Sequence, residues 1–290
     1  MSTTRKGILL AGGRGTRLYP LTANTSKQLI AVYNKPMIYY SLSTVMLAGI
    51  REILLISTPR DLGAYQELLG DGTRFGIELI YEEQAEPRGI AEAFLIGETF
   101  LDEHPSMLML GDNLFYGRMD FLRSASADQS DNAVIFGYEV ANPSDYGVVH
   151  FDKNWRATKL EEKPKSPTSR WAIPGLYFYP PDVSRKARAL DPSGRGELEI
   201  TDLNKEYMSL DRLKVVPMGR GIAWFDTGTA TALLEAANFI EAIEKRQGLI
   251  IGSPEEIALA QKFLSDEEFL ENVRRQPASD YKTYLENLVR

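Results

Sequence analysis

The sequence predicts an α/β fold: a doubly wound, mixed and mainly parallel sheet with helices on both faces, followed by a C-terminal helical appendage. Over residues 7–110, short apolar segments alternate with segments of helical spacing, which is typical of parallel strands joined by crossover helices. Residues 133–225 are rich in strand-like segments, and the chain beyond Gly228 is nearly all helical in pattern. These changes predict a core over residues 1–228 and a helical segment over residues 229–290.

The N-terminal elements follow from this alternation. The first strand is the apolar run before Gly12, and later strands are expected at residues 52–57, 77–81 and 107–110. Helices are expected at residues 36–48, 64–69 and 90–100. Ligands of such sheets bind beyond the carboxyl ends of the strands. Gly12, Gln84 and Asp112 each follow a predicted strand, so they are candidate site residues.

In the second half, strands are expected at residues 134–140, 147–152, 157–162, 175–179, 213–216 and 223–225, where they would extend the sheet and cover its ligand cleft. The stretch 194–203 leads into another helix. Residues 229–247 form an amphipathic helix with Gly248 as its C-terminal stop. Ser253 and Ser265, each followed by acidic residues, mark two further helix starts.

Composition limits the class of protein. The 290-residue chain is long enough to bury a sizeable core, and a content of 43% hydrophobic and 25% charged residues is ordinary for a globular protein. No apolar run approaches the roughly 18 residues of a membrane span, and polar residues 2–6 do not form a signal peptide. Cysteine is absent, which excludes disulfides and thiolate metal sites. We expect a cytoplasmic enzyme that does not enter a membrane.

Charge is unevenly distributed along the chain. The net charge is −7, but residues 1–60 contain eight Lys and Arg against one acidic residue, Glu52, so this stretch carries +7 and the remainder −14. A local cationic stretch in an acidic protein suits a small anionic ligand better than a nucleic acid backbone. We therefore expect no nucleic acid partner.

A glycine-rich break follows the first strand, within residues 7–28. Its glycines let the backbone approach an anion, and cations follow them: Gly12, Gly13, Arg14, Gly15, Arg17 and Lys27. A dinucleotide fingerprint would need glycine at position 18, which is Leu18, and the Gly-Lys-Ser/Thr of a Walker loop is missing. The pattern indicates a triphosphate-binding turn; a glycine turn with solvated cations is the alternative.

Further candidates follow predicted strands. Asp112 and Asp226 are expected at strand ends, and two such carboxylates facing a triphosphate would hold Mg²⁺, although each also fits a plain turn. Lys163, which precedes Pro164, and Arg195, in a glycine-rich turn, are candidates for a second phosphate, with a solvated charge cluster as the alternative. Two histidines do not indicate a histidine-based mechanism.

Together, the motifs LAGGRGTRL, SKQL, KPMIYY, LGDN, YGVV, LEEKP, GLYFY, RGELEITD, MGRG and DTGT resemble those of the glucose-1-phosphate thymidylyltransferases, a family of sugar-1-phosphate nucleotidylyltransferases. The resemblance covers nearly the whole chain and is weakest after about residue 250. It implies Mg²⁺-dependent conversion of dTTP and α-D-glucose 1-phosphate to dTDP-glucose and pyrophosphate, the entry to dTDP-rhamnose and other deoxysugars. It also implies a homotetramer, a nucleotide-binding part over residues 1–130, a sugar-binding part over 131–228, and a role of 229–290 in assembly and regulation.

The resemblance also implies roles for individual residues. The nucleotide would be bound by Leu10, Gly12, Gly13, Gly15, Thr16, Arg17, Gln28, Gln84, Pro87, Gly89 and Asp112. The sugar phosphate would be bound by Asn113, Tyr146, Gly147, Glu162, Lys163, Ile173, Tyr177 and Arg195. The catalytic set would be Arg17, Lys27, Asp112, Lys163 and Asp226, with the metal on Asp112 and Asp226. A dTDP-sugar feedback inhibitor would bind near Gly117, Arg118, Gly219 and Arg220, where Arg118 replaces a histidine common in the family.

Two other functions remain open from the sequence. A transferase for another pair of nucleotide and sugar 1-phosphate, such as one that uses UTP, would share these motifs. A non-catalytic nucleotide-sugar sensor would be expected to lack some of Arg17, Lys27, Asp112 and Asp226, and all four are present.

Overall fold

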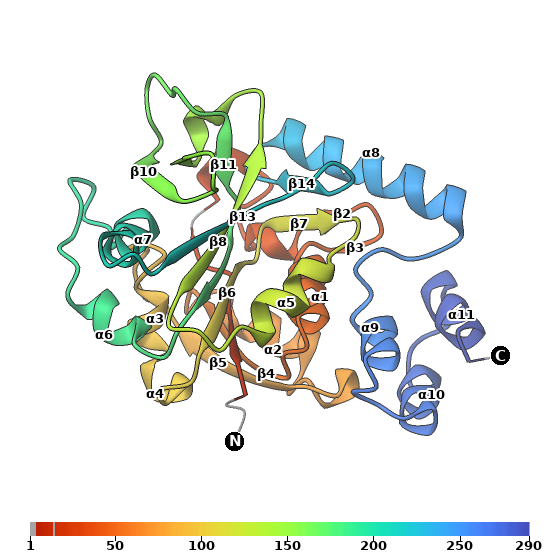
Figure 1. The fold of residues 1–290 in the computed structure, drawn as a ribbon. Coiled ribbons are helices and arrows are strands. Elements are labelled where there is room, and N and C mark those ends of the chain that lie inside the picture. Colours follow the sequence, from red (N-terminus) through yellow and green to blue (C-terminus); the bar gives the residue numbers. More distant parts are fainter. Residues whose placement is uncertain (1–3, 14, 290) are drawn as a thin grey trace.

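The computed structural model describes residues 4–13 and 15–289. Its main sheet consists of β1 (Lys6–Leu10), β4 (Glu52–Ser57), β5 (Glu78–Glu83), β6 (Ser106–Leu110), β8 (Ala133–Glu139), β9 (Gly147–Phe151), β10 (Ala157–Glu162), β11 (Trp171–Ile173), β12 (Leu176–Tyr179) and β13 (Leu213–Pro217). In space the order is β10-β9-β11-β8-β12-β6-β1-β4-β5, and β13 pairs with β8 (Figure 1).

The N-terminal half of the sheet is parallel. β1 lies between β4 and β6 and pairs in parallel with both, and β4 pairs in parallel with β5. Successive residues of β1 point to opposite faces, so Leu9 joins one buried cluster and Ile8 and Leu10 join the other. Because both faces are covered, the inner strands β1, β4 and β6 are mainly apolar, whereas the edge strand β5 contains three glutamates and is largely exposed. The predicted doubly wound α/β class is confirmed.

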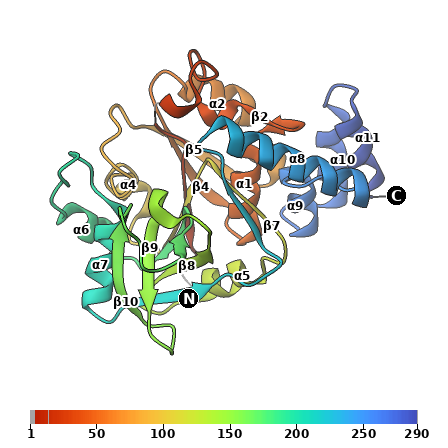
Figure 2. The same ribbon diagram turned by 90° about the horizontal axis from the view of Figure 1, so that it is seen from above.

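Helices cover the two faces as separate layers (Figures 1 and 2). The first buried cluster takes side chains from α1 (Ile38–Leu47), α2 (Leu62–Leu69) and α5 (Asp120–Ala127). The second takes side chains from α3 (Ala93–Ile96), α4 (Glu98–Leu101), α6 (Val183–Arg188) and α7 (Ile200–Ser209). The single helix expected over residues 90–100 is therefore wrong: it is broken at Gly97, where an added Cβ would lie 3.0 Å from Leu54 of the sheet.

The second half of the sheet is mainly antiparallel. β12 pairs antiparallel with β6 and β8, while β9, β10 and β11 continue the sheet outward. The predicted strand over residues 223–225 does not join this sheet. Instead β14 (Ala223–Asp226) pairs with β7 (Asn113–Tyr116) in a separate antiparallel ribbon, and β2 (Ala31–Val32) pairs with β3 (Lys35–Pro36).

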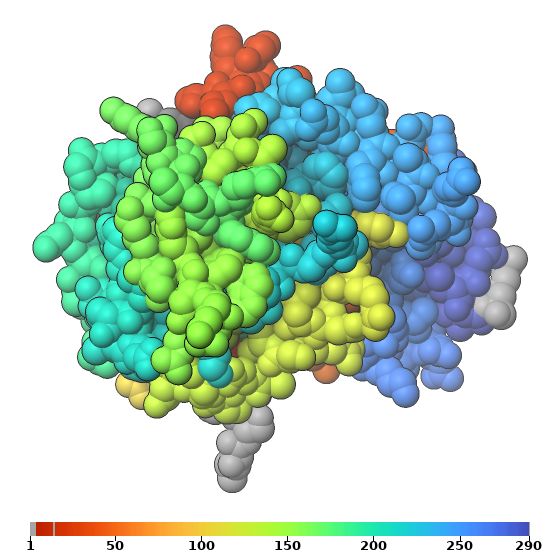
Figure 3. Space-filling model, turned by 45° about the horizontal axis from the view of Figure 1, so that its top comes forward, coloured from red at the N-terminus to blue at the C-terminus, as the bar shows by residue number. Residues whose placement is uncertain are grey.

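The C-terminal helices are α8 (Ala230–Gln247), α9 (Pro254–Ala260), α10 (Asp266–Arg274) and α11 (Asp280–Asn287). The predicted starts are confirmed, because the Ser253 and Ser265 side chains cap α9 and α10 and Gly248 ends α8 in a left-handed conformation. Helices α9–α11 contribute Ile257, Phe269, Val273 and Leu285 to the main core cluster. Much of their apolar surface is thus buried within the chain. The helices lie along one side of the molecule, where they are coloured blue in Figure 3. The division at residue 228 stays a prediction.

Within residues 4–13 and 15–289, none of the helices has both the length and the apolar character needed to cross a lipid bilayer.

A buried ion pair connects the β2–β3 hairpin to the end of α8. Lys35 Nζ lies 3.1 Å from Glu244 Oε1, and the two side chains are 4% and 6% exposed. Glu244 also accepts hydrogen bonds from Asn34 Nδ2 at 2.7 Å and from the Ile251 backbone N–H at 2.8 Å. The carboxylate therefore connects the hairpin to α8, about 210 positions away, and also holds the segment that follows α8.

Removal of one partner of this pair should be costly. Lys35→Met leaves the Glu244 charge buried and unpaired, so the free energy of unfolding should fall by about 3–5 kcal/mol, measured by urea denaturation. The double variant Lys35→Met, Glu244→Leu should recover most of the loss. Lys245→Met removes the exposed partner of Glu241 and serves as the control. Equal losses for Lys35→Met and Lys245→Met would contradict the role of the buried pair.

Candidate functional site

The candidate site is a cleft at the carboxyl ends of β1, β5 and β6. It contains two adjoining cavities of about 330 and 170 Å³, which share Leu110, Asp112, Glu162 and Lys163 in their walls. The larger cavity is lined by most of the predicted nucleotide residues, Leu10, Gly12, Gly13, Gln28, Gln84, Pro87 and Gly89, together with Lys27. The smaller one is lined by Asn113, Tyr146, Gly147, Ile173 and Tyr177, with Arg17 and Asp226. Most members of the two predicted sets thus lie in neighbouring halves of one cleft. Arg17, predicted on the nucleotide, lines the smaller cavity, and the predicted Gly15 and Thr16 are in the wall of neither cavity.

The glycine-rich turn needs glycine for space and for conformation. A Cβ on Gly12 would lie 2.7 Å from Gln84 Oε1, and one on Gly15 would lie 2.8 Å from Thr22 Cγ2. Gly13 and Gly15 also have φ of 97° and 57°, where other residues are strained. Thr16 then begins a short 3₁₀ helix, η1 (Thr16–Leu18). The predicted cation Arg14 lies outside the described residues.

Two cations lie next to the predicted metal carboxylates. Lys27, at the start of the 3₁₀ helix η2 (Lys27–Leu29), forms an ion pair with Asp112. Arg17 Nη2 and Asp226 Oδ1 lie 2.9 and 3.2 Å from the position that a Cβ on Gly228 would take. A larger residue at position 228 would therefore require the end of the Arg17 side chain to shift.

The two carboxylates interact electrostatically. Burial opposes ionisation of Asp112, but the Lys27 ammonium and the Asn113 amide outweigh it and hold the pKa of this carboxyl below its ordinary value. Burial and then the Asp112 charge raise the pKa of Asp226. The cleft therefore disfavours a second negative charge beside Asp112, and a cation between the two carboxylates would relieve this.

Asn113 holds this arrangement together. Its Nδ2 donates to Asp112 Oδ1 at 2.9 Å, and its Oδ1 accepts from Trp224 Nε1 at 2.7 Å and from the Gly175 backbone at 3.0 Å. The Asn113 amide therefore orients Asp112. Asn113 also lines the smaller cavity, and its predicted contact with the sugar phosphate stays a prediction. Trp224 also packs against Tyr146, with ring centroids 5.0 Å apart.

The wall of the smaller cavity contains a hydrogen-bonded carboxylate. Glu162 Oε2 accepts from Thr201 Oγ1 at 2.6 Å, which fixes the carboxylate beside Gly147. Lys163 follows β10 with φ of 42°, a left-handed conformation that is unusual for lysine and typical of constrained functional sites. Thr201 and Trp224 line this cavity. Thr201 lies in the motif RGELEITD and Trp224 in the predicted strand over residues 223–225, but no role was assigned to either.

Arg195 lies in the wall of the larger cavity rather than the smaller one. Its Nη2 lies 2.9 Å from Glu199 Oε1 and 3.5 Å from Glu162 Oε1. Glu199, which the sequence did not single out, therefore orients this guanidinium.

Gly89 lies near this wall in a left-handed conformation. Its φ is 105°, and an added Cβ would lie 2.3 Å from the Leu198 carbonyl oxygen. Glycine at this position lets the loop before α3 pack against the Leu198 backbone.

The predicted regulatory residues come together at the other end of the β7–β14 ribbon. Asn113 pairs with Asp226 at the cleft end, and Tyr116 pairs with Ala223 at the far end. There a Cβ on Gly117 would lie 2.2 Å from the Gly221 carbonyl oxygen, so the segments around Gly117 and Gly219 are in contact. The Arg118 side chain is 93% exposed and pairs with Asp120 at 3.0 Å. Arg220 is also exposed.

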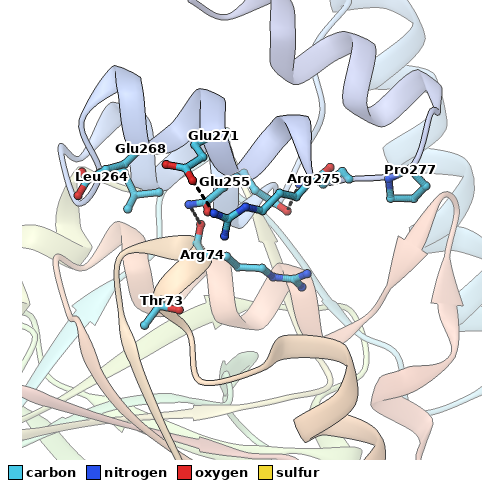
Figure 4. Close-up of a pocket in the computed structure, with 10 residues that line it drawn as sticks. Thr73, Arg74, Glu255, Leu264, Glu268, Glu271, Arg275 and Pro277 are labelled. Carbon is cyan, nitrogen blue, oxygen red and sulfur yellow. Dashed lines mark hydrogen bonds and ion pairs between the residues drawn. The ribbon is translucent and has the colours of Figure 1, made fainter.

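A further cavity of about 450 Å³ lies between the turn at Thr73–Phe75 and helices α9 and α10 (Figure 4). Several of its charged groups are partnered: Glu255 accepts from Tyr281 at 2.6 Å and from Gln276 at 3.2 Å, and Arg275 pairs with Glu271. It shares no lining residue with the cleft. This cavity contains none of the predicted site residues.

The chain is similar to proteins of known family. Residues 6–243 match the family model described as nucleotidyl transferase. The chain is 51% identical over 290 residues to a glucose-1-phosphate thymidylyltransferase from Xanthomonas campestris pv. campestris, with 99% of this chain and 98% of that protein covered. It is 50% identical over 287 residues to one from Neisseria meningitidis, with 98% and 99% covered.

The chain is also similar to solved structures of nucleotide-sugar enzymes. A candidate glucose-1-phosphate thymidylyltransferase from Bacillus anthracis, in complex with sucrose, superposes with a TM-score of 0.76 at 35% identity, over 81% of this chain and 94% of that one. A UDP-glucose pyrophosphorylase in complex with UDP-glucose has a TM-score of 0.73 at 22% identity, over 84% and 99%, and shows the fold alone. The chain therefore belongs to the nucleotidyl transferase family and, within it, to the glucose-1-phosphate thymidylyltransferases.

Proposed function

We propose that this nucleotidyl transferase transfers a thymidylyl group from dTTP to α-D-glucose 1-phosphate, which yields dTDP-glucose and pyrophosphate. The single observation that carries the proposal is the arrangement of the cleft. A glycine-rich turn with Lys27 lines one half, and Tyr146 and Tyr177 line the other. Asp112, Lys163 and a hydrogen-bonded Glu162 lie where the halves meet. A site of this kind suits the meeting of two phosphate groups.

The reaction requires neutralisation and alignment rather than a protein nucleophile. A phosphate oxygen of glucose 1-phosphate attacks the α-phosphorus of dTTP, the new P–O bond forms, and the bond to the bridging oxygen breaks to release pyrophosphate. Arg17 and Lys27 would stabilise the charge on the transferred group and the leaving pyrophosphate. Lys163 would hold the attacking phosphate. Since Lys27 pairs with Asp112 here, it would exchange that partner for phosphate oxygens when the nucleotide binds.

The donor set fits Mg²⁺. Asp112 and Asp226 line one cavity, and no cluster of three or more candidate ligand side chains is found among residues 4–13 and 15–289. Two carboxylates completed by substrate phosphate oxygens are a common Mg²⁺ arrangement. When bound, the ion would supply positive charge to the phosphate oxygens. Asn113 and Lys27 would keep Asp112 ionised and oriented.

We also propose a cytoplasmic homotetramer with a second, regulatory site for a dTDP-sugar end product. Gly117, Arg118, Gly219 and Arg220 gather at the far end of the β7–β14 ribbon, and its near end carries Asn113 and Asp226. Exposed Arg118 and Arg220 suit a diphosphate. The homotetramer rests on the family resemblance of the sequence.

The proposed activity is tested by pyrophosphate release with dTTP or UTP and several sugar 1-phosphates. We expect release that requires Mg²⁺ and is fastest with dTTP and glucose 1-phosphate. A preference for another sugar or nucleotide would replace the proposed pair. Absence of release with every pair would favour the sensor.

Asp112 should be essential to turnover. Asp112→Asn removes a carboxylate proposed for the metal, so kcat in the pyrophosphate assay should fall by at least about tenfold with the fold intact. Asp131→Asn is the control, because exposed Asp131 uses its backbone carbonyl rather than its carboxylate to bind Arg212. Unchanged turnover of Asp112→Asn at saturating Mg²⁺ would contradict the assignment.

Arg17 and Lys163 should affect different kinetic constants. Arg17→Ala should lower kcat by at least about tenfold, because its contact strengthens as charge develops on the transferred group. Lys163→Ala should instead raise KM for glucose 1-phosphate by about tenfold. Lys153→Ala removes an exposed charge and should change neither. If Lys163→Ala raised only the KM for dTTP, the two halves of the cleft would be reversed.

Feedback inhibition should be nearly independent of pH. Inhibition by dTDP-rhamnose should be non-competitive with dTTP and change little between about pH 6 and 8, because arginine keeps its charge where a histidine titrates. Steady-state inhibition of the wild type and of Arg118→His across this range measures the difference. Purely competitive inhibition would remove the second site, and equal pH dependence of both proteins would remove the role of Arg118.

A further inference from the structure

The amide of Gln84 has a fixed orientation at the floor of the larger cavity. Gln84 is 5% exposed, and its Nε2 donates to Glu92 Oε2 at 2.8 Å. The same nitrogen lies 3.4 Å from the Gly89 carbonyl oxygen. Glu92 is itself 5% exposed, and its other oxygen, Oε1, pairs with Arg88 Nη2 at 2.7 Å. Both oxygens of the Glu92 carboxylate are therefore in use.

This network permits one of the two amide orientations. A carboxylate and a backbone carbonyl only accept hydrogen bonds, so the NH₂ group of Gln84 must face both of them. Oε1 is then turned to the opposite side. It lies 2.7 Å from the position that a Cβ on Gly12 would take, beside the glycine-rich turn. Within the described part of the chain, no residue donates a hydrogen bond to this oxygen.

We infer that Glu92 is a positioning residue for base selection: it holds Gln84 so that the cavity presents a hydrogen-bond acceptor to the pyrimidine edge of the nucleotide. The inference rests on the proposed function, in which this cavity holds the nucleotide. Thymine and uracil carry N3–H, a donor that pairs with Oε1. Cytosine has an acceptor at N3. Two acceptors would then face each other without a hydrogen bond, so the cavity disfavours cytosine. The Gln84 Oε1 acceptor therefore discriminates thymine and uracil, which carry N3–H, from cytosine, which does not.

The test compares dTTP with 5-methyl-dCTP, because the two nucleotides share the methyl group and differ only at positions 3 and 4 of the ring. Calorimetry measures binding of each, and pyrophosphate release with glucose 1-phosphate measures kcat/KM. The wild type should prefer dTTP in both assays. In Glu92→Gln, the new side-chain NH₂ group can donate to Gln84, so the Gln84 amide can reverse. The preference for dTTP over 5-methyl-dCTP should then fall by at least about tenfold, while KM for glucose 1-phosphate stays the same.

Two further variants separate this role from general destabilisation. Glu255→Gln makes the same change at another buried glutamate, which lies outside the cleft, and should leave the nucleotide preference unchanged. The double variant Gln84→Glu, Glu92→Gln exchanges donor and acceptor. Its new carboxylate at position 84 can accept from position 92 and still offers only an acceptor to the base, so the dTTP preference should return.

The outcomes distinguish the inference from the proposed function. A folded Glu92→Gln that keeps the wild-type preference, an equal loss of preference in Glu255→Gln, or a double variant without recovery would each overturn the role of Glu92. If the wild type binds dTTP selectively but releases no pyrophosphate, the proposed reaction fails. A loss of binding preference in Glu92→Gln would then still support the role of Glu92.

Discussion

Two carboxylates, Asp112 and Asp226, line one buried cavity, and their repulsion must be offset by neighbouring cations. Lys27 pairs with Asp112, and Arg17 lies beside Asp226. Both cations come from the loop after β1, whereas the carboxylates come from the ends of β6 and β14. The glycine-rich turn, the edge of the parallel sheet and the β7–β14 ribbon are therefore held to one geometry by the need to balance charge away from water.

The β7–β14 ribbon connects the two carboxylates to other parts of the structure. Asn113, at its near end, binds Asp112, Trp224 and the Gly175 backbone, so the proposed metal carboxylate is connected to the wall of the sugar half. The far end of the ribbon contacts the segment of Gly219 and Gly221. A ligand there would act on the same paired strands that carry Asp226. This physical continuity supports the proposed regulatory site.

Buried hydrogen-bonding partners around the cleft orient the groups that face the substrates. Glu199 holds the Arg195 guanidinium, Thr201 donates to Glu162, and Glu92 fixes the Gln84 amide. Each of these partners is largely buried, so a missing hydrogen bond would not be replaced by water. Recognition in this cleft therefore depends on side chains that need not touch a substrate themselves.

The sequence by itself determined the α/β class, the strands before Gly12, Gln84 and Asp112, and the helix caps at Ser253 and Ser265, because apolar periodicity, glycine breaks and capping residues are local signals. Through the family resemblance, it also indicated most of the residues that line the cleft. It did not reveal the pairing of β14 with β7, since strand partners depend on contacts between segments about 110 residues apart. It also did not identify the contacts of Glu92, Glu199, Thr201 and Trp224. The sugar-phosphate roles of Arg195 and Asn113 stay predictions. The roles of these side chains depend on which partner lies within hydrogen-bonding distance, and only the folded chain decides that.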